Sequence, residues 1–564
     1  MTNQQRRWLS TIIAMISIVF GVLALGKPYW TLETMPVWLA LVVLLLVLWR
    51  GSLLHRSVIG LLVSAMAVTL VLERDFAIAI LVYGVLAYAI FVGVHRLGML
   101  RQGNRFAGIL GAALIITGVL GVYWVDVASI VIGLLIGPIL VIGGVFQIFH
   151  TWRESESGTQ SRQWATIAGR VGSVVLLLLA MVASFATYRT ILAEPTVDSF
   201  AEYTEPLGDE PGVLLRAMRF DRGMPESSVA TRILYTTTGH DGEIALATGF
   251  VIVPENAPTE PLPVILWTHG TTGVAVTCAP TLLSDPFGSG AMNFPELPLK
   301  QGWAIVAPDY LGLGASEPHP YIVGVPAAQS SLDAVRAARQ LDTISLSDDT
   351  VVWGHSQGGG AALWVGIEQR EYAPDVPLLG IAALAPASNL PEFIDTLMAG
   401  PVGPIFGGYI LRGYADWYTD VEFKEYVRPG ARFSQEKIVD RCLSEPSFMA
   451  NIASILIREP YTLADVHTGP LYERLQQNVP GEPTGVPLFL AQGASDPLIV
   501  PEAQADFVAH LCEAGQVVEY HTYAGRDHLG VVATDSPALG DLMDWTEARF
   551  AGEPAAGSCT TSEK

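Results

Sequence analysis

Residues 350–360 read Thr-Val-Val-Trp-Gly-His-Ser-Gln-Gly-Gly-Gly, and this stretch decides the fold of the C-terminal part of the chain. Its β-branched start predicts a short strand, and the residues after Gly360, Ala-Ala-Leu-Trp-Val, begin a helical pattern. Ser356 lies between the two in a Gly-x-Ser-x-Gly pattern. Such a turn is so tight that glycines must flank the serine, which is left exposed at the tip. We therefore predict a nucleophilic Ser356, because an ordinary helix N-cap serine would explain neither the strand nor the glycines.

A serine hydroxyl needs a base to take its proton, and that base is commonly a histidine oriented by a carboxylate. After a nucleophile in such a strand–turn–helix, the carboxylate comes next along the chain and the histidine last. Asp496 lies in a turn after the buried-strand pattern of residues 487–493, and His528 lies in the loop after the strand pattern of residues 517–523. We predict that Asp496 is the orienting carboxylate and His528 the base.

Other acids and histidines fit these roles less well. His521 lies inside a strand pattern and His355 lies within the turn itself, so we expect both to be structural. Asp527 is adjacent to His528 and is expected to point away from it, and Asp309 is expected to be a turn residue. The remaining histidines weighed for the role of base come too early in the chain or lie in a helical pattern: His240, His269, His319, His467 and His510.

The oxyanion formed on an attacked carbonyl needs N–H donors. One donor is expected from the backbone of Gln357, directly after the nucleophile. The second is expected from the glycine-containing loop of residues 269–273, which follows a strand pattern. Thr271 is the candidate, Gly270 is the alternative, and a simple glycine turn is the structural interpretation. No Cys/His spacing predicts a metal site, and we expect no cofactor.

The surrounding sequence alternates between strand and helix patterns. Strands are predicted at 244–254, 304–308 and 378–384, and an amphipathic helix at 327–341. This alternation predicts an α/β-hydrolase domain at 195–552, with a mostly parallel sheet and helices on both faces. The alternation stops at about 390–480, where aromatic residues, proline and glycine accumulate, and we expect an inserted cap there. Residues 553–564 are expected to form a flexible tail.

Three motifs together resemble the secretory lipase family of α/β-hydrolases. They are Trp-Thr-His-Gly-Thr-Thr-Gly at 267–273, Pro-Asp-Tyr-Leu-Gly-Leu-Gly at 308–314 and Gly-His-Ser-Gln-Gly-Gly at 354–359. The resemblance covers roughly residues 206–552. It implies hydrolysis of carboxylic esters, with lipids or other hydrophobic esters as substrates, by a triad of Ser356, Asp496 and His528. The chain departs from that family in its first third, since members are usually secreted without a multispanning anchor.

That first third, residues 1–190, predicts a membrane domain of about seven transmembrane helices. Several apolar stretches approach the ~20 residues needed to cross a bilayer, and the second and third are shorter. The first stretch could also be a cleaved signal peptide, but no cleavage pattern closes it and further stretches follow. The seven stretches are 9–25, 36–49, 57–72, 76–94, 106–124, 127–149 and 171–186.

Basic residues predict the orientation of these helices. With seven spans, four groups of arginines fall on one side, which should be the cytoplasm, so the hydrolase domain is expected outside the cytoplasm. All four cysteines follow the last span, and an even number in an extracytoplasmic domain predicts disulfides, with three possible connectivities. We expect Cys278 to pair with Cys442 and Cys512 with Cys559, and buried free thiols are the alternative.

The apolar stretches also repeat. Gly21-Val22-Leu23 recurs as Gly118-Val119-Leu120. This recurrence fits three helical hairpins spaced by roughly 47 residues, of which the middle copy is the weakest. Residues 106–149, with their regular glycines, resemble the HdeD-like membrane family linked to acid resistance. Glycines at such intervals are commonly helix-packing contacts.

The chain has 32 Lys+Arg and 54 Asp+Glu, a formal net charge of −22. Such an acidic protein should not bind nucleic acid or anionic lipid head groups by charge. We therefore expect a multi-pass protein of the cell membrane whose extracytoplasmic serine esterase or lipase domain acts through an acyl-enzyme. One alternative is an acyltransferase with the same triad. Another is a membrane stress or transport protein whose outer domain only binds an apolar ligand. The oligomeric state stays open.

Overall fold

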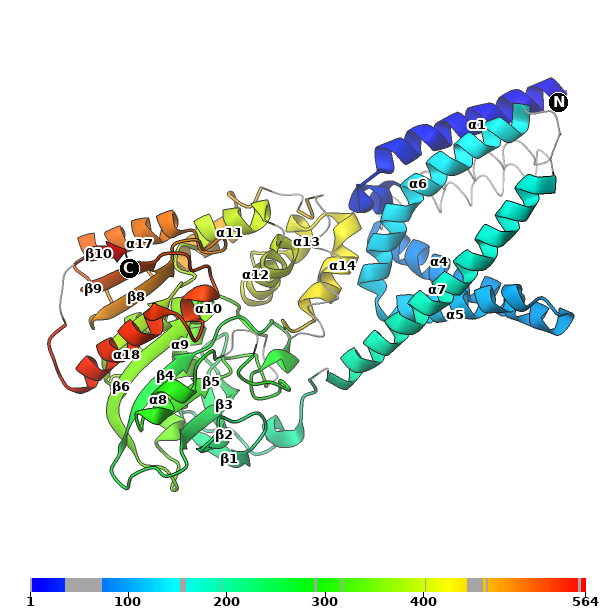
Figure 1. Cartoon of the computed structure of the whole chain (residues 1–564). Helices are drawn as coiled ribbons and strands as arrows, with labels where there is room; N and C mark the ends of the chain where they lie inside the picture. Colours follow the sequence, from blue (N-terminus) through cyan, green and yellow to red (C-terminus); the bar gives the residue numbers. More distant parts are fainter. Residues whose placement is uncertain are drawn as a thin grey trace. The chain divides into compact units, whose positions relative to one another are not determined.

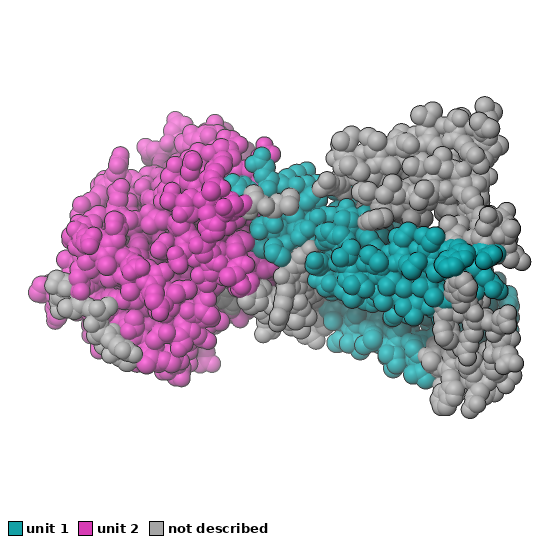
Figure 2. Space-filling model, turned by 90° about the horizontal axis from the view of Figure 1, so that it is seen from above, with its two compact units in different colours: residues 1–193, 424–438, 449–464 teal, residues 194–423, 439–448, 465–564 magenta. Residues whose placement is uncertain are grey.

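The chain forms two compact units (Figure 2). The helical unit consists of residues 1–193, 424–438 and 449–464, and the sheet unit consists of residues 194–423, 439–448 and 465–564. The computed structural model describes residues 3–35, 74–152, 159–193, 195–288, 292–315, 318–400, 402–443, 460–462, 465–555 and 559–563.

The helical unit contains α1 (Asn3–Ala24), α4 (Arg74–Gly98), α5 (Arg105–Tyr123), α6 (Val125–Trp152) and α7 (Thr159–Ala193) (Figure 1). Among the described residues, four helical segments are long and apolar enough to cross a membrane: Asp75–Gln102, Arg105–Tyr123, Val125–Ile148 and Arg170–Tyr188. A shorter apolar helix spans Ser10–Ala24. These five segments coincide with five of the predicted spans. The predicted spans at 36–49 and 57–72 lie outside the described residues.

Several glycines in the helical unit lie where two helices touch. A Cβ atom on Gly111 of α5 would lie 2.6 Å from the carbonyl oxygen of Gly93 in α4. A Cβ atom on Gly21 of α1 would lie 2.7 Å from the carbonyl oxygen of Gly137 in α6. Backbones at this separation leave no room for a side chain, so these glycines are helix-packing contacts, as their spacing predicts.

The sheet unit is built on a ten-stranded sheet with the order β1-β2-β3-β5-β4-β6-β7-β8-β9-β10. The pairs β1–β2, β2–β3 and β3–β5 are antiparallel, and the other pairs are parallel. The mostly parallel sheet expected from the sequence is therefore confirmed. The strands are β1 (Leu214–Phe220), β2 (Ser228–Thr238), β3 (Ile244–Pro254), β4 (Leu262–Thr268), β5 (Ala304–Pro308), β6 (Leu346–His355), β7 (Leu378–Leu384), β8 (Leu488–Gly493), β9 (Val518–Tyr523) and β10 (Thr560–Glu563).

Helices cover both faces of this sheet (Figure 1). The core on one face includes side chains of α9 (Gly324–Ala338), α10 (Gln357–Tyr372) and α17 (Pro501–Glu513). The core on the other face includes side chains of α8 (Glu296–Lys300) and α18 (Pro537–Phe550). The strands between them are buried on both faces, which explains their continuous apolar runs.

The described part of the region expected as a cap is mainly helical and is divided between the two units. Its helices in the sheet unit are α11 (Leu390–Ala399), α12 (Gly403–Trp417) and α16 (Pro470–Gln477). Residues 424–438, which carry most of α14 (Pro429–Val439), belong to the helical unit instead. The short helix α13 (Phe423–Tyr426) lies at the passage from one unit to the other.

Two disulfides close loops of the sheet unit. Cys278 in the loop after β4 pairs with Cys442, and Cys512 at the end of α17 pairs with Cys559 just before β10. These are the connectivities expected from the sequence. The first bond ties the interior of the cap region to the loop that follows β4.

Candidate active site

The sharp turn predicted from the sequence lies between β6 and α10. Ser356 has φ 59° and ψ −121°, a backbone conformation that costs energy for any residue with a side chain. A Cβ atom on Gly354 would lie 2.1 Å from the carbonyl oxygen of Gly358, and one on Gly358 would lie 2.0 Å from that of Thr268. Both glycines are therefore required for the turn to form. The backbone N–H of Ser356 donates to the carbonyl of Leu384 at 3.0 Å, which fixes the strained residue to β7.

The structure brings Ser356, His528 and Asp496 together. The Nε2 atom of His528 lies 2.9 Å from Oγ of Ser356, and its Nδ1 atom lies 2.8 Å from Oδ2 of Asp496. The serine comes from the turn after β6, the aspartate from the turn after β8 and the histidine from the loop after β9. An imidazole held between a carboxylate and a hydroxyl in this way can take a proton from the hydroxyl while the carboxylate fixes its tautomer.

Asp496 is held as a carboxylate. Its Oδ1 atom accepts the backbone N–H groups of Leu498 and Ile499 at 2.8 and 2.9 Å, and the side-chain amide of Gln492 donates to Oδ2 at 3.1 Å. Burial alone would raise the pKa of Asp496, but the hydrogen bond and charge of His528 and the two N–H donors outweigh it and lower the pKa. The group therefore stays ionised and oriented beside the imidazole.

His355 holds the loop of His528. Its Nε2 atom lies 2.9 Å from the carbonyl oxygen of His528 and donates to it, and the two rings lie 4.8 Å apart. Burial and then the nearby His528 lower the pKa of His355 to about 3, so the ring stays neutral. Its Nε2–H is committed to the loop that carries His528, which fits the structural role expected from the sequence.

The other competitors also lie away from the reacting serine. The Nε2 atom of His521 in β9 lies 2.8 Å from a carboxylate oxygen of Glu519. The carboxylate of Asp527 accepts the backbone N–H of Gly530 at 2.7 Å. Neither side chain is placed to orient or replace His528.

The expected oxyanion donors lie on two segments in direct contact. Gln357 is the first residue of α10, and Thr271 is buried in the loop after β4. The hydroxyl of Thr268, at the end of β4, donates to the carbonyl of Gly358 at 2.8 Å, which joins the two segments. The hydroxyls of Thr271 and Tyr321 lie 2.8 Å apart. The Thr271 side chain thus has a partner of its own, and the proposed donor is its backbone N–H.

Asp309 supports this region in a way that its sequence context did not reveal. It is fully buried after β5 and accepts the hydroxyls of Thr248 at 2.5 Å and Thr281 at 2.6 Å. Burial raises the pKa of Asp309. The carbonyl of the same residue lies 3.1 Å from Nε2 of His269, the first residue of the predicted oxyanion loop. The only sequence signal for this role is the place of Asp309 within the Pro-Asp-Tyr motif.

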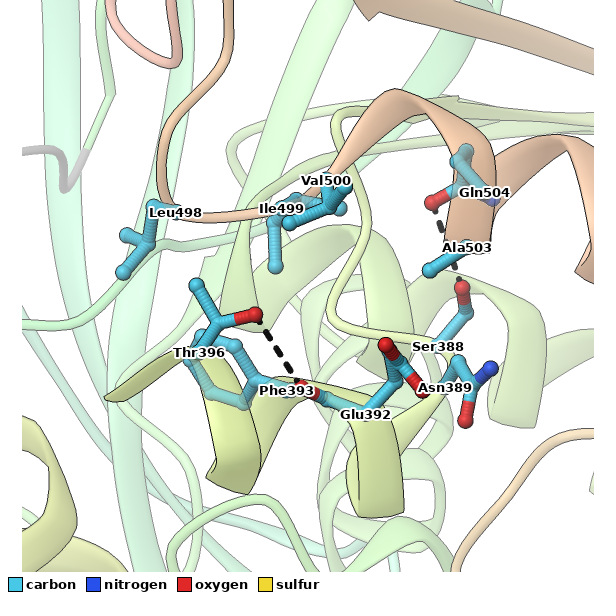
Figure 3. A pocket seen from close by; sticks show the side chains of 10 residues that line it. All are labelled: Ser388, Asn389, Glu392, Phe393, Thr396, Leu498, Ile499, Val500, Ala503 and Gln504. Carbon is cyan, nitrogen blue, oxygen red and sulfur yellow. Dashed lines mark hydrogen bonds between the residues drawn. The ribbon is translucent and has the colours of Figure 1, made fainter. Parts of the chain in front are cut away.

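A small cavity lies between α11 and the turn that leads into α17 (Figure 3). Leu498 and Ile499, whose N–H groups bind Asp496, form part of its lining. The rest comes from α11, from the start of α17 and from the residues directly before these two helices. None of the three triad residues lines it, so it is distinct from the space around Ser356. The lining residues are Ser388, Asn389, Glu392, Phe393, Thr396, Leu498, Ile499, Val500, Ala503 and Gln504.

Comparison with known families gives two matches. Residues 292–558 match the model of the secretory lipase family. Residues 109–186 match the model of a short repeat of unknown function, DUF308. The second match lies in the region whose glycines resemble the HdeD-like family, and its description names no activity.

Three curated relatives align with this chain over most of their own length. Lipase 6 of Candida albicans is 26% identical over 434 residues, which cover 68% of this chain and 88% of the relative. Secreted triacylglycerol lipase LIP3 of Malassezia globosa is 26% identical over 421 residues, covering 69% and 89%. A Mycobacterium tuberculosis protein named as a probable inactive lipase is 25% identical over 391 residues, covering 64% and 83%.

Solved structures show the same fold as the sheet unit. Candida antarctica lipase A in its closed state superposes with a TM-score of 0.53 at 18% identity, covering 66% of this chain and 88% of the lipase. A mutant of the rice cell wall degrading esterase LipA from Xanthomonas oryzae gives a TM-score of 0.50 at 19% identity, covering 61% and 98%. The sheet unit therefore has the α/β-hydrolase fold, and the family match and named relatives support a carboxylic-ester hydrolase similar to secretory lipases.

Proposed function

We propose that this chain is a membrane-anchored, extracytoplasmic serine esterase or lipase that hydrolyses esters of hydrophobic acyl chains. The observation that carries the proposal is the hydrogen-bonded series Ser356–His528–Asp496 at a strained turn, with separations of 2.9 and 2.8 Å. The names of the relatives supply the substrate class, because they are lipases and secreted triacylglycerol lipases.

In the proposed reaction, His528 takes the hydroxyl proton as Oγ of Ser356 attacks the ester carbonyl carbon. The negative charge on the carbonyl oxygen is stabilised by the N–H groups of Gln357 and Thr271. The bond to the alcohol oxygen then breaks, and His528 gives its proton to the departing alcohol. Water, deprotonated by His528, attacks the acyl-enzyme and releases the carboxylic acid, which restores Ser356.

The nucleophile can be tested with the full chain in detergent, assayed against esters of graded acyl length. Ser356→Ala removes the attacking oxygen, so we expect kcat to fall by on the order of 10⁶ with the fold intact. Ser331→Ala is a matched control, because this buried serine donates to the carbonyl of Ala327 in its own helix. A folded Ser356→Ala protein that keeps more than about a hundredth of the wild-type rate would contradict the assignment.

The helix ends support the proposed orientation. The indole N–H of Trp124, which follows α5, donates to the hydroxyl of Thr187 near the end of α7 at 2.7 Å. These ends therefore lie on one side of the helical unit, and the chain continues from α7 into the sheet unit. Arginines follow α4 and precede α5 and α7 at the opposite ends, which by the positive-inside rule belong in the cytoplasm.

A protease added to intact cells tests this orientation. We expect it to cleave the sheet unit without lysis, while a cytoplasmic marker protein stays intact. Protection of the sheet unit until the cells are opened would exclude the proposed orientation.

A further inference from the structure

Residues 424–438 come from the cap region but pack in the helical unit. The side chain of Phe433 on α14 packs against an apolar cluster of helix residues, and its ring meets that of Tyr83 on α4 edge to face at 5.9 Å. The buried members of the cluster are Leu32, Ile78, Val82, Leu86 and Val125. Apolar burial therefore joins this part of the cap region to the helices.

Two arginines of the segment form ion pairs with acids of the helical unit. The guanidinium of Arg428 binds both carboxylate oxygens of Glu33, at 2.7 and 3.0 Å, and the two side chains are only 16% and 13% exposed. Arg432 pairs with Asp75 at 3.0 Å. A two-pronged, mostly buried arginine–carboxylate pair fixes both position and direction, whereas an exposed pair contributes little.

The backbones also touch. A Cβ atom on Gly430 would lie 2.2 Å from the carbonyl oxygen of Tyr29, and the N–H of Gly430 donates to Glu33 at 3.1 Å. The returning chain lies against the same segment, since the N–H of Arg428 donates to the carbonyl of Tyr461 at 2.9 Å. Main-chain atoms as well as side chains therefore take part in this contact, so the segment is closely packed against the helices.

The acids that receive the two arginines lie on the predicted outer side. Glu33 falls between the first and second predicted spans, and Asp75 directly precedes the fourth. With the N-terminus inside, both positions are extracytoplasmic, as is the predicted hydrolase domain. The basic residues of the segment therefore meet acids on the side where the proposed orientation places the cap region.

We propose that the helical unit grips the cap region through residues 424–438 and thereby sets the enzyme to act on ester lipids held in the bilayer. This inference rests on the proposed function and on the expected role of residues 390–480 as a cap. Because Glu33 and Asp75 are predicted at the outer ends of spans, the ion pairs of Arg428 and Arg432 hold residues 424–438 close to the predicted membrane surface. The helical unit is then a positioning element for lipid substrates as well as an anchor.

The grip can be tested without any activity. Tyr83→Cys with Phe433→Cys places thiols on two rings now in contact, and a protease site engineered in the linker at residues 195–213 lets the chain be cut. We expect a short bismaleimide linker to hold the two fragments together on a denaturing gel. Tyr88→Cys with Phe433→Cys is the matched control, because Tyr88 lies on the same helix and is 68% exposed. Equal linking of both pairs, or of neither, would overturn the proposed contact.

The consequence for substrate choice is tested by exchanging charges. Glu33→Arg or Arg428→Glu should lower the rate on long-chain ester lipids in neutral vesicles by roughly tenfold, since each leaves two like charges in a mostly buried site. The rate on a short soluble ester should change less than about twofold, because the triad is untouched. The double exchange should restore the vesicle rate.

The two experiments separate the grip from the enzyme activity. Equal losses on both substrates, no loss on either, or failure of the double exchange would overturn the positioning role. If the wild-type protein hydrolyses neither substrate, the proposed enzyme activity fails. The cysteine experiment still decides whether the grip exists.

Discussion

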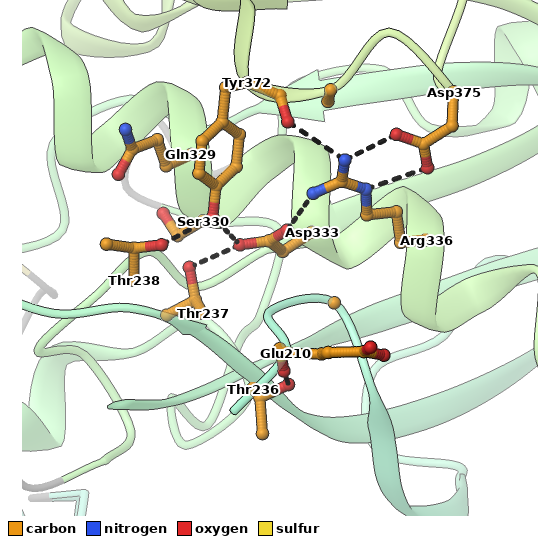
Figure 4. A network of polar contacts seen from close by, with 12 residues as sticks. Glu210, Thr236, Thr237, Thr238, Gln329, Ser330, Asp333, Arg336, Tyr372 and Asp375 are labelled. Carbon is orange, nitrogen blue, oxygen red and sulfur yellow. Dashed lines mark hydrogen bonds and ion pairs between the residues drawn. The ribbon is translucent and has the colours of Figure 1, made fainter. Parts of the chain in front are cut away.

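Two buried aspartates in the sheet unit accept similar sets of hydrogen bonds but differ in the direction of their pKa shifts. Asp496, in the turn after β8, accepts His528, two backbone N–H groups and one amide. Asp333, on α9, accepts the hydroxyls of Thr237 at 2.8 Å and Tyr372 at 2.7 Å and the guanidinium of Arg336 at 3.0 Å (Figure 4). Both carboxylates have a positive or potentially positive partner and several donors.

Their acidities move in opposite directions. Burial raises the pKa of Asp333 to about 6, because the hydrogen bonds from Tyr372, Thr237 and Arg336 offset its desolvation only in part. At Asp496 the donors outweigh burial and the pKa is lowered. Backbone N–H groups fixed by the turn favour the charged form without reorganisation. A buried, hydrogen-bonded carboxylate therefore marks a reactive site only when its partner in turn faces a nucleophile.

The largest effect expected from this comparison is on catalysis. Asp496→Asn keeps the shape of the side chain but favours the wrong tautomer of His528, so we expect kcat to fall by about 10⁴ in folded protein. The measurement is initial-rate kinetics on a soluble ester. Asp527→Asn is the matched control, since Asp527 is adjacent to His528 but binds the N–H of Gly530. If Asp527→Asn is the crippling change and Asp496→Asn is nearly silent, the orienting carboxylate has been misassigned.

The two aspartates also differ in how far the sequence could predict them. The turn at Ser356 is visible because a strained residue between close backbones requires Gly354 and Gly358, and the order of Asp496 and His528 along the chain follows from the fold. These are local constraints. Asp333 gave no such signal, because an aspartate in an amphipathic helix is expected on the solvent face. Its burial depends on Tyr372 and other residues distant in sequence.

Larger elements follow the same rule. Strands β3, β4, β5, β7 and β8 consist mostly of apolar residues and coincide with patterns in the sequence. The edge strand β1 has several exposed residues and the edge strand β10 is short and polar, so their patterns are weak. Packing of residues 424–438 in the helical unit could not be predicted either. It depends on pairs such as Glu33 with Arg428, which are 395 residues apart.

A smaller effect is expected on stability at the second aspartate. Asp333→Ala leaves the hydroxyls of Thr237 and Tyr372 and one prong of Arg336 without their acceptor, which should destabilise the sheet unit by roughly 1–3 kcal/mol. Activity at low temperature should stay within about twofold, because Asp333 is not part of the triad. Residual activity after heating measures the loss. A variant that is as heat-resistant as wild type but catalytically impaired would reverse the roles assigned to the two aspartates.

The smallest effect separates the charge of Asp333 from its contacts. Its pKa of about 6 in the folded protein lies above the ~3.9 of an unfolded aspartate, so between these values the folded state binds more protons. The stability contributed by this group is therefore fully present below about pH 4 and is lost as the pH rises through 6. The amide of Asp333→Asn does not titrate, so the variant does not lose stability in this way.

The free energy of unfolding of Asp333→Asn, relative to wild type, should therefore rise by on the order of 1–3 kcal/mol as the pH rises from about 4 to 7. Asp496→Asn is a control that lacks this trend. Denaturation of the two proteins across that range measures the difference. If the stability of Asp333→Asn relative to wild type instead falls as the pH rises, the ion pair with Arg336 holds Asp333 ionised. The contrast between the two carboxylates then disappears.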